Sequence, residues 1–245
     1  MELTIVKGIP IPERLGQQSI RDSKTCVAIE ECGEPIRSVT GLSLRIQSYP
    51  YYQKLGFKAA LTDCYVREGV AKRLVDAAEH LPKGYSLIIW DGWRPYELQQ
   101  ELYDRYRDTL ISQGWTDGEA LKQEVTKFVA LPSVNPDQPA PHLTGGAVDL
   151  TIAGPDGWLD MGTEFDEFCP KARTRYFESL ENPTPAEAAV RENRRLLFHV
   201  MREAGFTNYQ EEWWHFDYGN PRWAAQKDVQ PIYKGILTLQ EQKID

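Results

Sequence analysis

Two short segments of the sequence each contain half of a set of metal ligands. His142 and Asp149 lie in the first, P-H-L-T-G-G-A-V-D-L, and Glu212 and His215 lie in the second, E-E-W-W-H-F. Two imidazoles and one carboxylate can hold a catalytic zinc ion and leave a fourth position open for water. A second carboxylate nearby can take a proton from that water. The two segments together therefore favour a zinc hydrolase.

The spacing within each segment suggests how these side chains could meet. Gly145 and Gly146 permit a tight turn, so His142 in a loop and Asp149 in a strand can approach one point. On a regular strand, Glu212 and the histidine three residues later would point to opposite faces. Glu212 therefore need not be a ligand and can instead be the base. Either segment alone also fits another interpretation, a packed histidine that is hydrogen-bonded and binds no metal.

Two more segments contain candidate site residues. D-G-W-R-P places Arg94 where a predicted strand gives way to a helix, and a guanidinium there can polarise a carbonyl or stabilise an oxyanion. The alternative is a buried Asp91–Arg94 ion pair that fixes the turn. The segment M-G-T-E-F-D-E-F contains Asp166, whose carboxylate could equally cap a turn or a helix.

Composition excludes several other classes of protein. The chain has 245 residues, 41% of them hydrophobic, and a net charge of −8 without any basic run, which argues against nucleic-acid and anionic-membrane partners. No apolar run approaches the ~20 residues that span a bilayer. The first residues lack the basic and apolar regions of a signal peptide, so we expect a cytoplasmic protein. Its 4 cysteines are scattered, and we expect reduced thiols.

Hydrophobic periodicity predicts the main elements. Helices are expected over residues 67–81, 95–114, 117–129 and 185–204, and strands over 85–90 and 147–152, with a strand pair over 206–218. Residues 1–40 lack periodicity and are expected to form an irregular arm packed on a domain over residues 41–245. Because strands and helices do not alternate regularly, the predicted class is α+β, a single domain with a small, mostly antiparallel sheet flanked by helices.

These four segments, in this order, resemble the zinc D-alanyl-D-alanine dipeptidases related to vancomycin resistance. That family also contains D,D-carboxypeptidases and shares a metal-site fold with the Hedgehog signalling domain. The resemblance covers about residues 60–219. It implies a metallopeptidase that hydrolyses D,D-dipeptides with a free N-terminus and uses one zinc ion per chain. By position, it places the zinc ligands at His142, Asp149 and His215.

The resemblance also implies roles for three other residues. Its catalytic base falls on Glu212, its carbonyl-polarising arginine on Arg94, and the carboxylate that holds the substrate ammonium on Asp166. The chain departs from the family at Ala140, where a serine usually stands two residues before the first zinc histidine. That serine helps to form the pocket for the substrate N-terminus, so the departure leaves the metal chemistry intact and the preferred dipeptide open.

Two alternative functions remain at this stage. A D,D-carboxypeptidase or another cell-wall peptidase would act on longer peptides, and a metal-stabilised binding domain would have lost catalysis. The expected partner is a small D,D-dipeptide, with no nucleic acid and no membrane. The sequence decides neither the oligomeric state nor whether the reaction serves glycopeptide resistance or the recycling of D-alanine.

Overall fold

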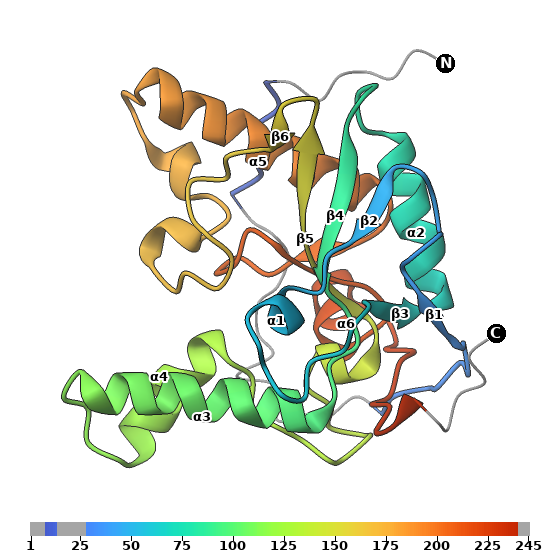
Figure 1. Ribbon diagram of the computed structural model, residues 1–245, viewed down its shortest axis with the longest axis vertical. Coiled ribbons are helices and arrows are strands. Elements are labelled where there is room, and N and C mark those ends of the chain that lie inside the picture. Colours follow the sequence, from blue (N-terminus) through green and yellow to red (C-terminus); the bar gives the residue numbers. More distant parts are fainter. Residues whose placement is uncertain (1–7, 14–27, 240–245) are drawn as a thin grey trace.

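A six-stranded sheet forms the centre of the computed structural model, which describes residues 8–13 and 28–239 (Figure 1). Its strand order is β2-β4-β5-β8-β7, with β6 paired to β5. The strands are β2 (Ile46–Ser48), β4 (Ser86–Asp91), β5 (Ala147–Gly154), β6 (Gly157–Trp158), β7 (Thr207–Asn208) and β8 (His215–Asp217). Among the strands that the structure describes in this sheet, only β2 and β4 pair in parallel. The prediction of a small, mostly antiparallel sheet is therefore confirmed.

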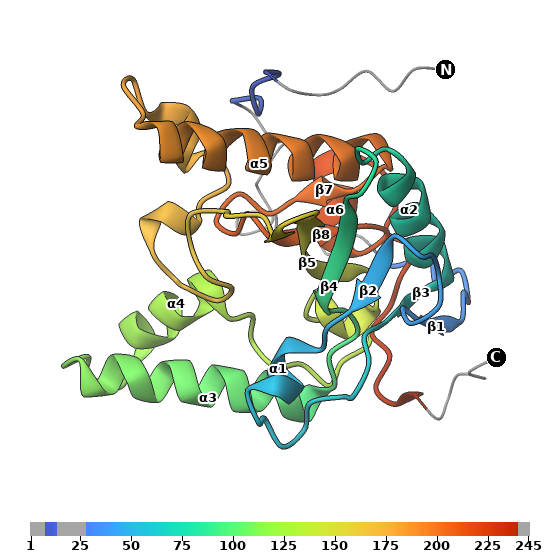
Figure 2. The same cartoon turned by 45° about the horizontal axis from the view of Figure 1, so that its top comes forward.

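The helices flank this sheet as the sequence predicted. The elements are α1 (Tyr51–Lys54), α2 (Glu68–Glu79), α3 (Tyr96–Ser112), α4 (Glu119–Phe128), α5 (Pro185–Glu203) and α6 (Pro221–Lys227), with 3-10 turns η1 (His142–Thr144), η2 (Pro170–Ala172) and η3 (Tyr176–Ser179). Helices α2 and α5 lie against the sheet, whereas α3 and α4 form a hairpin beside it (Figures 1 and 2). The four long helices were expected, but α1 and α6 were not.

Local signals explain where two of these helices begin. Thr184 and Glu187 form a capping box at the start of α5, in which each side chain bonds the other's backbone N–H. Helix α6 starts at Pro221, and the Asn220 side chain accepts a hydrogen bond from the backbone N–H of Trp223. This cap fixes the first turn of α6, which reaches the functional site described below.

Strands β4 and β5 are buried on both faces, which explains their almost continuous apolar sequences. Side chains from α2 and α5, such as Leu74 and Met201, join them in one hydrophobic core. Burial of such side chains contributes roughly 1.5–3 kcal/mol each and holds the central strands in place. In the part of the chain that the structure describes, no helix has the length and apolar character needed to cross a bilayer.

Part of the N-terminal segment has more regular structure than expected. Strand β1 (Ile36–Ser38) pairs antiparallel with β3 (Tyr65–Arg67). Within residues 8–13, Ile11 is buried and its backbone N–H donates to the carboxylate of Glu178 at 3.0 Å. Residues 1–7 and 14–27 lie outside the described part of the chain, so a domain boundary at residue 40 stays a prediction.

The glycine pair before β5 allows this strand to approach its neighbours closely. A Cβ atom at Gly146 would lie 2.5 Å from the Tyr218 carbonyl oxygen and 2.9 Å from the Tyr233 ring. We therefore expect Gly146→Ala to lower the free energy of unfolding by about 1–3 kcal/mol, measured by urea denaturation. The control Gly154→Ala should cost much less, because its nearest neighbour is the Tyr85 side chain at 3.3 Å. Equal losses in the two variants would contradict this explanation.

Candidate active site

The predicted metal ligands meet at one end of neighbouring strands. His142 lies in η1, while Asp149 of β5 and His215 of β8 are direct cross-strand partners. Their ligand atoms all lie within 4.8 Å of one another, and the three side chains are buried. His215 Nδ1 is 3.2 Å from His142 Nε2 and 3.0 Å from Asp149 Oδ1. The fold therefore brings together residues that lie far apart in the sequence.

The opposite nitrogen of each histidine has a hydrogen-bond acceptor. His142 Nδ1 lies 2.8 Å from the Gly92 carbonyl oxygen, and His215 Nε2 lies 3.1 Å from Asp217 Oδ1. A carbonyl and a carboxylate oxygen only accept, so these nitrogens carry the protons. The two remaining nitrogens, His142 Nε2 and His215 Nδ1, lie 3.2 Å apart, and His215 Nδ1 is also 3.0 Å from Asp149 Oδ1. A proton or a metal ion can lie between them, and outer contacts of this kind are typical of metal-bound histidine.

The charges of the site also favour a cation at this point. Burial lowers the pKa of His215, but the carboxylates of Asp217 and Asp149 outweigh burial and raise it to about 10. Burial raises the pKa of Asp149, but the adjacent His142 and His215 outweigh that effect and hold it well below its usual range. The three side chains therefore stabilise positive charge among them.

The separations between the donor atoms agree with zinc. A tetrahedral ion with bonds of about 2.0–2.1 Å places its donor atoms about 3.3 Å apart. Here the separations from His215 Nδ1 are 3.2 and 3.0 Å, and Asp149 Oδ2 lies 3.4 Å from His142 Nε2. The three residues could therefore hold a metal ion, and their types and spacing suit zinc.

Glu212 lies in the turn before β8 and not on the strand itself, so the alternation that separates strand neighbours does not apply to it. Its Oε2 is 3.8 Å from His215 Nδ1, and its side chain lines the cavity beside the ligands. Burial, reinforced by the nearby Asp149, raises the pKa of Glu212 to about 8 although His215 opposes the shift. A raised pKa makes the deprotonated Glu212 carboxylate a stronger base than that of an ordinary glutamate.

The position of Arg94 agrees with both interpretations of the D-G-W-R-P motif, a structural ion pair and a group that faces the substrate. Its Nε donates to Asp91 Oδ2 at 2.7 Å, so the ion pair that fixes the turn does form. The same guanidinium donates to Gln99 Oε1 at 3.0 Å and lies 3.4 Å from Asp149 Oδ2. It is 7% exposed and lines the cavity. Arg94 is therefore held rigidly next to Asp149, a predicted metal ligand, where it can face a substrate oxygen.

Asp166 stands on the cavity wall and is joined to Arg94 through one residue. Tyr52 OH donates to Asp166 Oδ2 at 2.7 Å and accepts from Arg94 Nη2 at 3.3 Å. Burial raises the pKa of Asp166 to about 7, and the hydrogen bond from Tyr52 opposes this shift. Its φ of 57° lies in the left-handed region, which aspartate adopts more readily than most residues.

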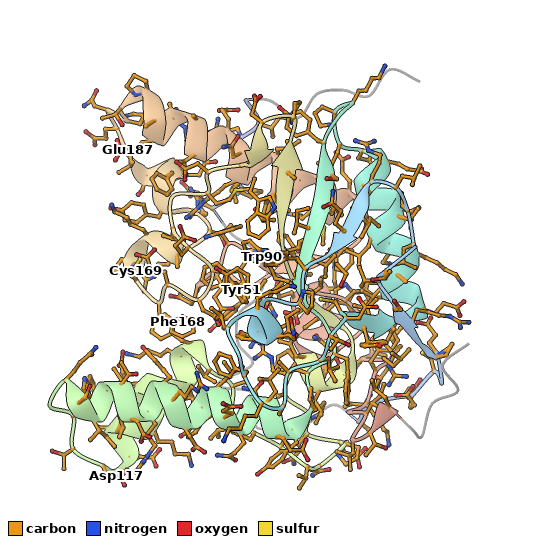
Figure 3. The ribbon with its side chains drawn as sticks, in the orientation of Figure 1. Tyr51, Trp90, Asp117, Phe168, Cys169 and Glu187 are labelled. Carbon is orange, nitrogen blue, oxygen red and sulfur yellow. The ribbon has the colours of Figure 1, made fainter. Side chains whose placement is uncertain are left out.

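Aromatic packing holds the loop that carries Asp166. The ring of Phe165 lies 4.9 Å from Trp90 at the end of β4 and 5.0 Å from Tyr51 in α1. Tyr51 and Trp90 also contact each other near the centre of the molecule, with ring centroids 5.6 Å apart (Figure 3). These edge and tilted contacts fix the backbone next to Asp166.

A cavity of about 1020 Å³ opens beside the ligands, between the sheet and the α3–α4 hairpin. Ring packing and a hydrogen bond attach this hairpin to loops on the opposite wall. Phe168 stacks on Phe128 of α4 with centroids 5.0 Å apart, and Tyr209 OH donates to the Lys127 carbonyl oxygen at 3.0 Å. The hairpin therefore forms a fixed cover over one side of the site.

The sequence did not point to three residues that contact the site. Asp217 is fully buried and follows His215 by two positions, a spacing that places both side chains on one face of a strand. This spacing in the sequence could have indicated that Asp217 lies beside His215. Tyr52 and Arg222 lie in the short elements α1 and α6, which have too few residues to show periodicity.

Comparison with known proteins identifies the family. A family model described as D-ala-D-ala dipeptidase, peptidase M15, matches residues 55–230. The chain belongs to this family. It is 29% identical over 217 residues to a D-alanyl-D-alanine dipeptidase of Synechocystis sp., covering 82% of this chain and 88% of the relative. It is 31% identical to a D-alanyl-D-alanine dipeptidase of Enterococcus faecalis, covering 61% of this chain and 70% of the relative.

Among solved structures, the chain is similar to the vancomycin resistance D,D-pentapeptidase VanY in complex with Zn(II). The two share 19% sequence identity with a TM-score of 0.41, over 88% of this chain and 97% of that chain. Family membership, which the four segments predicted, therefore rests on the family model and the curated relatives.

The contribution of the hydrogen bond between His215 and Asp217 to metal binding can be tested by mutation. We expect Asp217→Asn to weaken zinc binding about 10- to 100-fold, because a neutral amide oxygen accepts the hydrogen bond from His215 Nε2 more weakly than the carboxylate and no longer increases the basicity of the ring. Affinity can be measured by competition with a chromophoric chelator. His199→Ala is the control, since that histidine lies on α5 and contacts the Ile9 carbonyl oxygen. An unchanged affinity in Asp217→Asn would show that Asp217 does not support the metal ligand.

Proposed function

We propose that this protein is a zinc-dependent dipeptidase that hydrolyses D-alanyl-D-alanine. The observation that carries the proposal is the buried group of His142, Asp149 and His215, which opens into a cavity and lies within the region matched by the dipeptidase family. A zinc ion bound by these residues would supply Lewis acidity, which lowers the pKa of water and polarises a peptide carbonyl.

Three side chains around the metal ligands would transfer the proton, stabilise the oxyanion and bind the substrate N-terminus. Glu212 accepts the proton of the attacking water and returns it to the amine that leaves, a role supported by its position beside His215. Arg94 donates hydrogen bonds to the carbonyl oxygen as negative charge develops there. Asp166 pairs with the substrate ammonium, and Tyr52 holds its carboxylate towards the cavity. A charge pair in a partly buried site of this kind strongly disfavours peptides with blocked N-termini.

The size of the cavity favours a second candidate. Pockets for drug-sized ligands measure about 300–1,000 Å³, and the cavity here, at about 1020 Å³, has more room than two alanine residues require. A D,D-carboxypeptidase that removes the last residue of a longer peptide would use this room. The two activities share the cleaved bond and differ in what the substrate carries at its N-terminus. A cytoplasmic location and the absence of membrane partners stay predictions.

The proposed base can be tested by Glu212→Gln. We expect kcat for D-Ala-D-Ala to fall about 10²- to 10⁴-fold, because the amide cannot accept the proton of water. Zinc content, measured by atomic emission, should stay at one ion per chain. Glu211→Gln is the matched control, since the neighbouring carboxylate pairs with Arg173 at 2.9 Å on the cavity wall. A Glu212→Gln enzyme with wild-type turnover would exclude Glu212 as the base.

The role of Asp166 can be tested with substrates that differ only at the N-terminus. A dipeptidase should cleave D-Ala-D-Ala at least roughly 100-fold better than N-acetyl-D-Ala-D-Ala, because the acetyl group leaves Asp166 unpaired. In Asp166→Asn this preference should largely disappear, whereas the exposed Glu164→Gln should retain it. Comparable cleavage of both peptides by the wild type would instead support the carboxypeptidase.

A further inference from the structure

Arg222 belongs to the cavity wall and borders a metal ligand. It is the second residue of α6, and its guanidinium stacks on the ring of Tyr209 at 4.1 Å. Its Nη1 lies 3.1 Å from His215 Nε2, so only the width of an imidazole ring separates it from the nitrogen that faces the other ligands. The side chain is 22% exposed and faces the cavity. A cation is therefore held next to the reacting centre.

The other cations of the cavity wall have carboxylate partners. Such pairs join Arg94 to Asp91, Arg105 to Glu101, Lys127 to Glu124, and Arg173 to Glu211. Within residues 8–13 and 28–239, Arg222 is the cavity cation with no carboxylate at hydrogen-bond distance. Its nearest carboxylate oxygen, Asp217 Oδ2, is 3.7 Å away.

His215 does not accept a hydrogen bond from Arg222 either. His215 Nε2 donates its proton to Asp217 Oδ1 and so cannot accept a hydrogen bond from the nearby Nη1. Among the residues that the structure describes, the donors of this guanidinium, which is 22% exposed, then meet no oxygen at hydrogen-bond distance. Arginine presents these donors as a planar fork whose geometry matches a carboxylate. The vacant partner is therefore best supplied by a carboxylate that arrives with the substrate.

We infer that Arg222 binds the C-terminal carboxylate of the peptide substrate. The inference rests on the proposed function, and it holds for a dipeptidase and a carboxypeptidase alike, because both cleave the last peptide bond. In either case the carboxylate is one α-carbon beyond the nitrogen that leaves, so its receptor must lie close to the metal ligands. Arg222 meets this condition beside His215, whereas Asp166 is linked through Tyr52 to Arg94. Opposite charges thus flank the site and fix the direction of the peptide.

The experiment compares D-Ala-D-Ala with its C-terminal amide, D-Ala-D-alaninamide. We expect the wild type to prefer the acid roughly 100-fold in kcat/KM, since the amide leaves Arg222 unpaired. In Arg222→Met the KM for the acid should rise about 100-fold with a smaller change in kcat, and the preference should disappear. Arg222→Lys, which keeps the charge, should retain part of it. Arg105→Met removes a paired cavity cation and should keep the full preference.

Zinc content provides a readout that does not depend on turnover. Arg222→Met should bind as much zinc as the wild type, because Arg222 is not a ligand. If kcat/KM in Arg222→Met fell equally for the acid and the amide, or if the variant lost zinc, Arg222 would only support His215. Either result would overturn the inference. A wild type that cleaves D-Ala-D-Ala with no preference for the acid would overturn it as well. A wild type that leaves D-Ala-D-Ala intact would overturn the proposed function and the inference with it.

Discussion

The register of three adjacent strands is the constraint on which the site depends. Asp91 of β4 pairs with Asp149 of β5, and Asp149 pairs with His215 of β8. Hydrogen-bonded strands lie about 4.8 Å apart, so paired residues are brought within reach of one ion or one guanidinium. A shift of one residue in β5 would turn Asp149 to the other face of the sheet and separate it from both neighbours. The hydrophobic core that maintains this register therefore also keeps the side chains of the site in position.

Charge balance links the parts of the site that the strands bring together. Asp91 fixes Arg94, Arg94 contacts Tyr52, and Tyr52 holds Asp166. On the other side of the ligands, Asp217 orients His215. In these contacts each charge has a hydrogen-bond partner, and a buried charge without one would cost several kcal/mol. Removal of one member would therefore disturb the groups beyond it as well as its direct neighbour.

Much of this arrangement could be predicted from local sequence. The long helices and the buried strands β4 and β5 follow from hydrophobic periodicity, and the glycines before β5 indicated how His142 and Asp149 could meet. The contacts of Tyr52 could not be predicted, because 42 residues separate it from Arg94 and 114 from Asp166. Elements such as α1, with 4 residues, and β1, with 3, are too short to carry a periodic signal.

The α3–α4 hairpin shapes the cavity but is separate from the residues that could bind the metal. The ligands lie on β5, β8 and η1, whereas one wall of the cavity comes from the hairpin, which contributes residues such as Leu102, Tyr106 and Phe128 but no member of the ligand group. Mutations in the hairpin can reshape the cavity while the strands that carry the candidate metal ligands stay unchanged. Changes in this one segment could therefore alter which ligands the cavity accepts, and the hairpin is the natural place to redesign selectivity.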